Sequence, residues 1–248
     1  MRLQGKIILV AGASSGMGRQ AALRIGAEGA TVIAAARRLA DCQAVADQIG
    51  GDSIALAIDG SDAGSVTAGF AMIQQKFGRL DGAFNNLGSS MGTGRLHEIP
   101  DAQWQASLAV NLTAPFLLMK AEIPLLMAAG GGVIINNAST AGVRGAKGMA
   151  DYAAAKWGLI GLGQSVALEY GAEGIRVNSI APGIIRTEKM QDIEAQLPAV
   201  FGGLRASIPG GAFGEMADIA SLVSWLLSDE ARFINGATIR IDGGMSAA

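Results

Sequence analysis

The chain of 248 residues carries 19 Lys and Arg against 21 Asp and Glu, and the resulting formal net charge of −2 gives no sign of a nucleic-acid-binding surface. Only 16% of the residues are charged and 50% are hydrophobic, which excludes an intrinsically disordered chain and leaves enough apolar side chains for a large core. The length favours one domain spanning residues 1–248, because chains divide into several domains mainly beyond about 250–300 residues.

Cysteine and histidine are each present once, and this limits the possible chemistry. Cys42 alone cannot form an intrachain disulfide, which favours a reducing compartment. With His97 as the single histidine there is no Cys and His cluster for zinc, so we expect no metal and place His97 on a loop or the surface. The apolar run that ends at residue 11 is too short for a signal peptide, and the uncharged run 123–143 contains proline, glycine and asparagine. We therefore expect a cytoplasmic protein with no membrane partner.

Short runs rich in Val, Ile and Ala predict strands, and stretches with helical spacing separate them. The runs are residues 6–11, 31–36, 53–58, 82–85, 133–136, 175–180 and 238–241. Because the runs are apolar throughout rather than alternating, both faces of each strand should be covered, and the helices between them should make right-handed crossovers. The sequence therefore predicts an α/β fold with a doubly wound parallel sheet of about seven strands and helices on both faces.

Residues 186–215 depart from this series. The segment mixes apolar and polar residues with Pro198, Pro209 and several glycines, and it contains no clear strand. We expect it to form a small, mobile substrate lobe or lid.

A glycine-rich loop directly follows the first predicted strand and leads into a helix. A phosphate group needs backbone that approaches closely without a Cβ atom, and the N-terminus of a helix supplies unpaired N–H groups and a partial positive charge. In this loop Gly12 would make the turn, Gly16 would admit a pyrophosphate and Gly18 would let the helix pack on the strand. The residues expected to hold a dinucleotide here are Gly12, Ser14, Ser15, Gly16, Met17 and Gly18.

Two alternatives compete with this interpretation. Residues 12–16 also match the G-x-S-x-G nucleophile elbow of serine hydrolases, but an elbow needs a histidine base late in the chain, and His97 is the only histidine. The hydrolase is therefore the least favoured hypothesis. The other alternative is a non-catalytic nucleotide-sensing protein on the same fold, because a fold alone does not determine an activity.

The end of the second predicted strand bears on which dinucleotide binds. Folds that prefer NAD usually place Asp or Glu about 20 residues after the loop, where it binds the ribose 2′-hydroxyl. Here Arg37 and Arg38 follow the strand, and guanidinium groups can bind a 2′-phosphate through charge-assisted hydrogen bonds. We expect NADP(H) to be preferred, with NAD(H) possible.

A second cluster consists of Ser139 at a strand end and of Tyr152 and Lys156 in a predicted helix. The spacing of Tyr152 and Lys156 puts them on one helical face, one turn apart. A tyrosine with a pKa of about 10 is a poor acid–base catalyst at neutral pH, but an adjacent ammonium group stabilises the phenolate. We therefore expect Lys156 to lower the pKa of Tyr152, which suits the pair to acid–base chemistry.

Together these motifs resemble the short-chain dehydrogenase/reductase family, in its branch of NAD(P)-dependent oxidoreductases of about this length. The resemblance covers almost the whole chain and rests on the glycine loop, the Asn-Asn-Leu-Gly motif at 85–88, Asn111, Ser139, Tyr152, Lys156 and Pro182-Gly183. It implies that Tyr152 is the general acid–base, Ser139 binds the substrate oxygen, Lys156 holds the nicotinamide ribose and Asn111 anchors a proton-relay water. The further cofactor contacts that it implies are Asp59, Gly60, Asn86, Gly88, Tyr152, Lys156, Pro182, Gly183, Ile185 and Thr187.

The same resemblance implies a Rossmann-like fold, a homotetramer, and reversible hydride transfer between NADP(H) and a secondary alcohol or ketone. Three positions depart from the family pattern: Ala11 stands where Thr is common, Leu87 replaces an Ala, and Gly60 replaces an apolar residue. They bear on adenine packing rather than on the catalytic residues. The substrate pocket is expected from residues 89–97, residues 140–149 and the lobe after Thr187. Its apolar residues would include Met91, Val143, Met149, Met190 and Phe201, and the choice among ketones, cyclic alcohols, sugars and steroids stays open.

Overall fold

The structure, a computed structural model, describes residues 1–188, 190, 194, 196 and 198–247. Within these residues a seven-stranded sheet has the order β3-β2-β1-β4-β5-β6-β9, and every pairing in it is parallel. The strands are β1 (Ile7–Ala11), β2 (Thr31–Ala36), β3 (Ile54–Ala57), β4 (Gly82–Asn85), β5 (Gly132–Asn137), β6 (Ile175–Pro182) and β9 (Thr238–Ile241). Each predicted run contributes one strand, so the predicted doubly wound, Rossmann-like sheet is confirmed.

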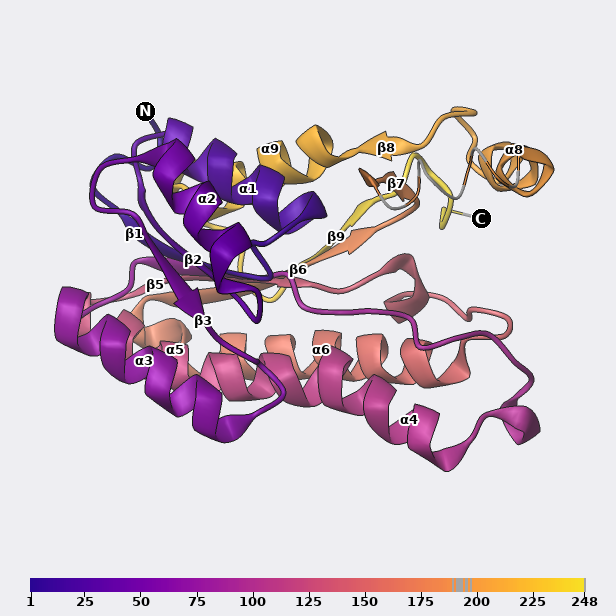
Figure 1. Cartoon of the computed structure of the whole chain (residues 1–248), viewed down its shortest axis with the longest axis horizontal. Helices are drawn as coiled ribbons and strands as arrows, with labels where there is room; N and C mark the ends of the chain where they lie inside the picture. The colour runs from indigo at the N-terminus through magenta and orange to yellow at the C-terminus, as the bar shows by residue number, and fades with distance from the viewer. Residues whose placement is uncertain (189, 191–193, 195, 197, 248) are drawn as a thin grey trace.

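Helices cover both faces of the sheet (Figure 1). One layer consists of α1 (Gly16–Ala27), α2 (Leu39–Ile49) and α9 (Met216–Leu227), and the other of α3 (Ala63–Phe77), α4 (Asp101–Leu108), α5 (Ala114–Ala128) and α6 (Ala150–Glu169). The central strands supply side chains to two cores at once. In β1, Ile8 and Val10 belong to the core under α1 and α9, whereas Leu9 belongs to the core over α3 and α5. The strands are apolar throughout because neither face meets water.

The helices α4 and α5 are joined by a π-helical turn, Ala109–Thr113. The resulting stretch Asp101–Ala128 is the one segment of the described residues that is long and apolar enough to cross a bilayer, and half of its most apolar window is buried in the molecule. In α5 the buried side chains include Leu118 and Leu126, which pack in the core over α3. The chain then turns through Gly130, at φ +81°, into β5, as expected for residues 123–143.

The lobe after β6 differs in part from the prediction. It contains α8 (Pro198–Ala206), and β7 (Ile185–Arg186) pairs in parallel with β8 (Gly214–Glu215) at its two edges. The expectation of no strand in this region was therefore wrong, because strands of two residues leave no periodicity in a sequence. Residues 189, 191–193, 195 and 197 lie outside the described residues. A small core packs the lobe, with the rings of Phe201 and Phe213 edge to face at 5.9 Å between centroids.

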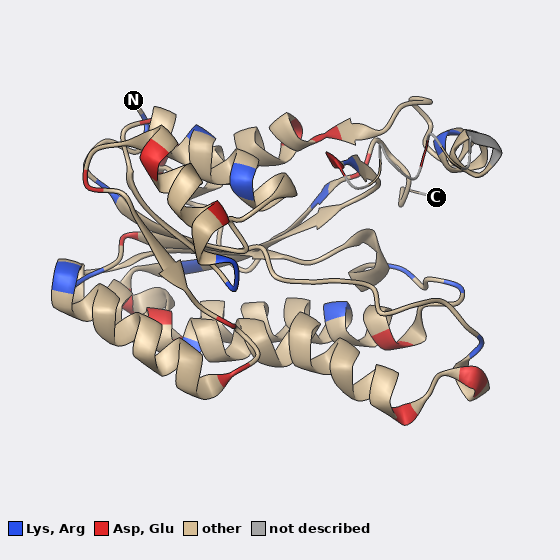
Figure 2. Ribbon diagram, in the orientation of Figure 1, with Lys and Arg blue, Asp and Glu red and all other residues tan. Residues whose placement is uncertain are grey.

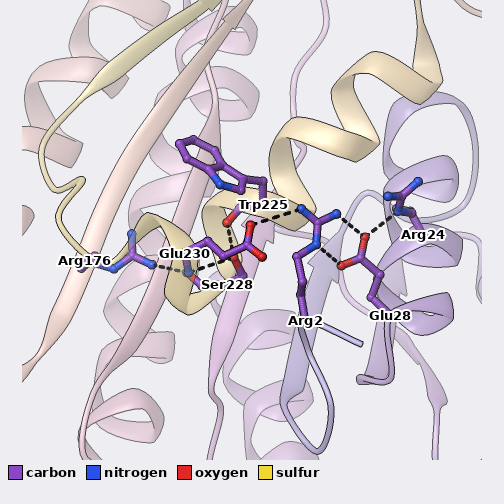
Figure 3. A network of polar contacts seen from close by, with 7 residues as sticks. All are labelled: Arg2, Arg24, Glu28, Arg176, Trp225, Ser228 and Glu230. Carbon is purple, nitrogen blue, oxygen red and sulfur yellow. Dashed lines mark hydrogen bonds and ion pairs between the residues drawn. The ribbon is translucent and has the colours of Figure 1, made fainter.

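A polar network joins the start of the chain to α1 and to the segment after α9 (Figure 3). Arg2 donates to both carboxylate oxygens of Glu28 at 2.7 and 2.8 Å, and Arg24 donates to Glu28 at 2.6 Å. Arg2 also lies 3.7 Å from Glu230. The side chain of Glu28 is only 11% exposed, and the hydrogen bonds from Arg2 lower its pKa to about 2. This bidentate pair anchors the start of the chain on α1.

The histidine lies on the surface, as the sequence predicted, and the cysteine lies in the interior. Cys42 is buried in α2, and burial raises the pKa of its thiol to about 11, so the thiol is unreactive at neutral pH. His97 is exposed in the short 3₁₀ turn Leu96–Glu98. Among the described residues no cluster of three or more His, Cys, Asp or Glu side chains could hold a metal ion.

Candidate active site

The carboxyl ends of the parallel strands meet at one edge of the sheet, where the order of strands reverses between β1 and β4. In open α/β sheets, ligands bind at such a switch point, because the two adjacent loops turn to opposite faces and leave a crevice. Here the loop after β1 leads into α1, and the loop after β4 begins with Asn86. The sequence motifs therefore meet at this edge.

Two glycines of the loop after β1, Gly12 and Gly18, are required by close backbone approaches. Gly12 has φ +83°, and a Cβ atom there would lie 2.5 Å from the carbonyl oxygen of Asn86. A Cβ atom on Gly18 would overlap the carbonyl oxygen of Gly12, so the absent side chain lets α1 pack on the loop. Gly16 has φ +57°, and a Cβ atom there would lie 3.9 Å from the side-chain methyl group of Thr187. At Gly16 the positive φ rather than a close contact favours glycine, and neither Gly16 nor Gly18 lines the two cavities described below.

A cavity of about 540 Å³ extends from this loop over the ends of β2, β3 and β4. The predicted cofactor residues that line it are Gly12, Ser14, Ser15, Arg37, Arg38, Asp59, Gly60, Asn86 and Gly88. Sequence reasoning missed Ser61 and Val110, which also line it. Ser61 donates to Asp59 from its hydroxyl at 2.6 Å and from its backbone N–H at 3.0 Å, and these bonds lower the pKa of Asp59. The position of Ser61 two residues after a predicted contact was the available signal.

The two arginines at the end of β2 have different surroundings. Arg38 donates to the hydroxyls of Ser14 and Ser15 at 3.1 and 3.3 Å, and it also pairs with Asp41. Arg37 lies near Asp59, whose pKa its charge helps to lower. The guanidinium group of Arg38 and two loop hydroxyls therefore gather at one end of the cavity, which forms a donor cluster suited to a phosphate group.

A second cavity of about 160 Å³ continues the first and shares Asn86, Leu87 and Gly88 with it. It collects most of the remaining predicted residues. They are Met17, Ser139, Tyr152, Lys156, Pro182 and Gly183. Asn137 also lines this cavity and was not predicted; its side chain donates to Asn86 at 2.7 Å.

Lys156 is nearly completely buried, at 1% exposure. Its Nζ donates to the carbonyl oxygens of Asn137 at 2.7 Å and Leu87 at 3.3 Å, and it lies 5.7 Å from the centre of the Tyr152 ring. Burial lowers the pKa of Lys156 to about 7. The lysine is thus oriented by two backbone carbonyls, one at the end of β5 and one in the chain after β4, rather than by a carboxylate.

The direction of the Tyr152 pKa is opposite to the sequence-based expectation. Burial raises it, and the hydrogen bond with the side chain of Ser139 lowers it by less. The physical reason is that removing a phenolate from water costs more than one neutral hydrogen bond returns. The ammonium group of Lys156 is directed at backbone carbonyls rather than at Tyr152. Burial also lowers the pKa of Lys156, so its charged form is less favoured. The two catalytic candidates nevertheless lie together, as predicted.

Asn111 is buried in the π-helical turn between α4 and α5. Its Nδ2 donates to the carbonyl oxygens of Ser89 at 2.9 Å and Ser107 at 3.0 Å, and its Oδ1 accepts from the N–H of Ser89. A Cβ atom on Gly88 would lie 2.8 Å from both Asn111 Oδ1 and Lys156 Nζ. Gly88 therefore lets Asn111 and Lys156 approach the same point, although the Asn111 side chain is already used to hold the chain after β4.

Comparisons with known proteins agree with this geometry. A family model described as enoyl-(acyl carrier protein) reductase matches residues 12–246. The chain is 38% identical over 245 residues to 3-oxoacyl-(acyl-carrier-protein) reductase FabG of Escherichia coli, covering 99% of each chain. It is 34% identical to levodione reductase of Leifsonia aquatica, covering 100% of this chain and 96% of that one. The solved structure of levodione reductase superposes with a TM-score of 0.94 at 33% identity over the full length of both chains. The chain belongs to the short-chain dehydrogenase/reductase family.

As a short-chain dehydrogenase/reductase, the protein is an oxidoreductase of a family that binds NAD(P). Another relative, cyclohexanol dehydrogenase of Acinetobacter, is 34% identical over 99% of this chain and 97% of its own. The relatives thus differ in the compounds that their names contain, so membership of the family leaves the substrate of this chain undetermined.

Two residues expected at the nicotinamide end of a short-chain dehydrogenase/reductase lie outside both cavities. Ile185 is buried in β7 and lines a separate cavity of about 360 Å³ with Phe213 and Asp242. Thr187 faces Gly16, and its hydroxyl accepts from the N–H of Met190 at 3.4 Å. Both therefore lie on the lobe side of the crevice and line neither of the two joined cavities.

Proposed function

We propose that the protein is an NADP(H)-dependent oxidoreductase that interconverts a secondary alcohol and a ketone, with Tyr152 as general acid–base. One observation carries this proposal: the two joined cavities place the glycine loop and Arg38 at one end and Ser139, Tyr152 and Lys156 at the other. A nucleotide sensor needs only the first end. The presence of Tyr152 beside the buried Lys156 at the second end therefore favours an enzyme over a non-catalytic protein.

The residues present fit a dinucleotide. Gly12 and Gly18 leave no room for a Cβ atom, and the first turn of α1 offers N–H groups to a pyrophosphate. Asp59, Asn86 and Gly88 would hold the groups further along the joined cavities. When bound, the dinucleotide supplies or accepts the hydride. NADP(H) is preferred in this proposal because Arg38, Ser14 and Ser15 form a donor cluster at the end of β2.

Each catalytic candidate has a separate role. Tyr152 donates a proton from its hydroxyl to the carbonyl oxygen in the reducing direction and removes it in the oxidising direction. Ser139 donates a hydrogen bond to the same oxygen, since it is the hydroxyl next to Tyr152 in the cavity. Lys156, whose Nζ lies 5.7 Å from the centre of the Tyr152 ring, would bind the nicotinamide ribose, and Asn111 would anchor a relay water.

The serine hydrolase alternative loses support from the same geometry. Its nucleophile would be Ser14, but Ser14 lines the larger cavity beside Arg38, and His97 is an exposed residue paired with Glu98 at 3.7 Å.

A second substrate class is suggested by the relative named 3-oxoacyl-(acyl-carrier-protein) reductase, so 3-oxoacyl thioesters are to be assayed beside cyclic ketones. Met91 lines the larger cavity and gives this side an apolar residue.

The proposal includes a homotetramer in the cytoplasm, without nucleic-acid or membrane partners. Figure 2 shows Lys and Arg dispersed over many elements and interspersed with Asp and Glu, which is unlike a nucleic-acid surface. Phe116 on α5 and Trp157 on α6 are 44% and 51% exposed, and such aromatic side chains are typical of contacts between subunits.

A paired titration tests the cofactor proposal without knowledge of the substrate. Energy transfer from the three tryptophans to NADPH or NADH would measure each dissociation constant. We expect NADPH to bind about tenfold or more tightly than NADH, as one additional charge-assisted contact would produce. Tighter binding of NADH would overturn the NADP(H) preference, and binding of neither would overturn the proposed dinucleotide-dependent reaction.

A further inference from the structure

A buried carboxyl group lies one layer below the active site, on α5. Glu122 is fully buried, and its Oε2 accepts from the side-chain amide of Asn85 at 3.2 Å. Asn85 donates its other amide hydrogen to Oδ1 of Asn136 at 3.1 Å. Asn136 in turn donates to the sulfur of Met119 at 3.3 Å. No residue of the catalytic proposal above belongs to this cluster.

The cluster contains two unsatisfied acceptors. Within the described residues, neither Oδ1 of Asn85 nor Oε1 of Glu122 has a hydrogen-bond donor, although both atoms are buried. Both hydrogens of the Asn85 amide are already donated to Glu122 Oε2 and Asn136 Oδ1, so the Asn85 amide cannot donate to Oε1 of Glu122. A buried carbonyl or carboxylate oxygen without a donor is costly. If Oε1 of Glu122 carries a proton, it becomes a hydrogen-bond donor, and Oδ1 of Asn85 can accept from it. Both unsatisfied oxygens then take part in one hydrogen bond.

The position of the cluster connects it with the reaction. Asn85 and Asn136 are register partners at the ends of β4 and β5, and the next residue on each strand, Asn86 or Asn137, lines the active-site cavity. Asn137 donates to Asn86 at 2.7 Å and accepts from Lys156 at 2.7 Å. Whatever displaces the lower pair therefore shifts the upper pair, because the two pairs are joined by single peptide units.

We propose that Glu122 is a neutral carboxylic acid that donates to Asn85 and acts as a positioning residue for Asn86, Asn137 and Lys156. The proposal rests on the cofactor binding proposed above in so far as Asn86 and Lys156 are expected to contact the dinucleotide. Ionisation of Glu122 removes the donor and leaves a negative charge with no counter-ion below the two strand ends, so the cofactor site loses its geometry.

Within the described part of the chain, no cation compensates a charge on Glu122. The charged side chains on the helices packed around it are Lys76 on α3, Lys120 on α5, and Asp151, Lys156 and Glu169 on α6. Lys76, Lys120 and Glu169 are exposed, Asp151 accepts from Gln103, and Lys156 is directed at Asn137 and Leu87. Burial raises the pKa of Glu122 to about 8, and the hydrogen bond from Asn85 lowers it by less. The unsatisfied oxygens and the raised pKa thus both indicate that Glu122 is protonated, and therefore uncharged, at neutral pH.

The test compares the wild type with E122Q, whose amide can make both hydrogen bonds to Asn85 but cannot ionise. The dissociation constant for NADPH is measured from pH 6.5 to pH 9.5. In the wild type it should rise by about tenfold for each pH unit above the pKa of Glu122, relative to E122Q. Tyr152 and Lys156 titrate in both proteins, so their effect cancels in the ratio of the wild-type dissociation constant to that of E122Q. A constant ratio across the pH range would overturn the positioning role.

A second measurement does not depend on the cofactor. Because the folded-state pKa is raised above the usual value of about 4.5, the folded protein holds one more proton than the unfolded chain between about pH 4.5 and pH 8. The melting temperature of the wild type should therefore fall relative to that of E122Q as the pH rises through this window, and the difference should then level off. A pH-independent difference would overturn the neutral acid.

The variant E122L can neither accept from nor donate to Asn85, so it tests the loss of both hydrogen bonds between residues 122 and 85. It should bind NADPH more weakly than the wild type at pH 6.5, with E122Q close to the wild type. If E122L does not fold, the comparison of the wild type with E122Q still decides. Absence of NADPH binding by the wild type at pH 6.5 would contradict the proposed function instead, and the melting temperatures would then decide whether Glu122 is neutral.

Discussion

Gly60 and Leu87 occupy complementary positions beside the larger cavity, because a Cβ atom on Gly60 would overlap Cδ1 of Leu87. Both residues depart from the family pattern, and the sequence alone offered no connection between them. In the structure one departure accommodates the other: the larger side chain after β4 fills the space that the missing side chain after β3 leaves. Ala114 and Leu118 of α5 close the other side of this space, at 3.4 and 3.8 Å from the same Cβ position.

This relationship predicts a compensating pair of substitutions. Gly60→Ala should lower the free energy of unfolding by about 1 kcal/mol, because it overpacks the contact with Leu87, whose side chain can move only partly. The same substitution in a Leu87→Ala background should cost less, so that a double-mutant cycle gives a coupling energy of at least about 0.5 kcal/mol. Urea denaturation of the four proteins measures it. Additive effects would contradict this packing.

Tyr152→Phe tests the catalytic role. Removal of the phenolic hydroxyl removes the proton donor but leaves the ring, so turnover should fall by about 10³-fold or more. The dissociation constant for NADPH should change by less than about threefold, since Lys156 and its backbone partners stay in place. Steady-state assays with a ketone and fluorescence titration measure the two effects. Retained turnover would refute the general acid–base role.

The arginines at the end of β2 give a graded prediction for cofactor preference. Arg38→Asp should weaken NADPH by about tenfold or more relative to NADH, because it removes the guanidinium beside Ser14 and Ser15 and places a carboxylate there. Arg37→Asp should also weaken NADPH more than NADH, but by less, since Arg37 lies nearer Asp59. Equal weakening of both dinucleotides by either substitution would contradict the assignment of a 2′-phosphate site.

The ion pair at the N-terminus predicts a pH dependence of stability. The folded-state pKa of Glu28 is lowered from about 4.5 to about 2, so its contribution is fully present above about pH 4.5 and is lost as the pH falls toward 2. At neutral pH the contribution is about 3 kcal/mol, because each pKa unit corresponds to about 1.4 kcal/mol. Urea denaturation of Glu28→Gln at pH 7 and pH 3 should show a loss at pH 7 that shrinks at pH 3.

Glu230→Gln provides the matched control for this pair. The Glu230 side chain is 57% exposed and contacts Arg2 at 3.7 Å only, so the substitution should cost less than about 1 kcal/mol at either pH. If Glu28→Gln and Glu230→Gln have equal effects at pH 7, the bidentate contact of Arg2 with Glu28 does not stabilise the protein in this way.

The quaternary prediction is independent of chemistry. A tetramer of a 25.2 kDa chain should scatter light as a particle of about 100 kDa. Trp157→Glu should dissociate it, because the exposed indole on α6 would be replaced by a charge that an apolar interface cannot accommodate. Gln75→Glu, at an exposed position on α3, is the comparison for a change of charge alone. A 25 kDa particle for the wild type would refute the tetramer.

The strands and the site motifs could be predicted because their signals are local. A buried parallel strand needs a continuous apolar run, so 31–36 and 82–85 have the same bounds in the prediction and in the structure. The glycine loop and the spacing of Tyr152 and Lys156 are likewise read along one segment. The paired strands β7 and β8 were missed because two residues carry no period, and Val110 and Asn137 were missed because only the folded chain brings them to the cavities.

By itself the sequence determined the order and type of the elements, the loop that can accept a phosphate and the residues that meet at the strand ends. Tertiary structure alone decided the protonation properties and the packing. The pKa of Tyr152 is raised and that of Lys156 lowered because burial depends on what covers a side chain, which no spacing reveals. In the same way Gly60 makes room for Leu87, and Glu122 lies against Asn85, because residues far apart in the chain share one interior.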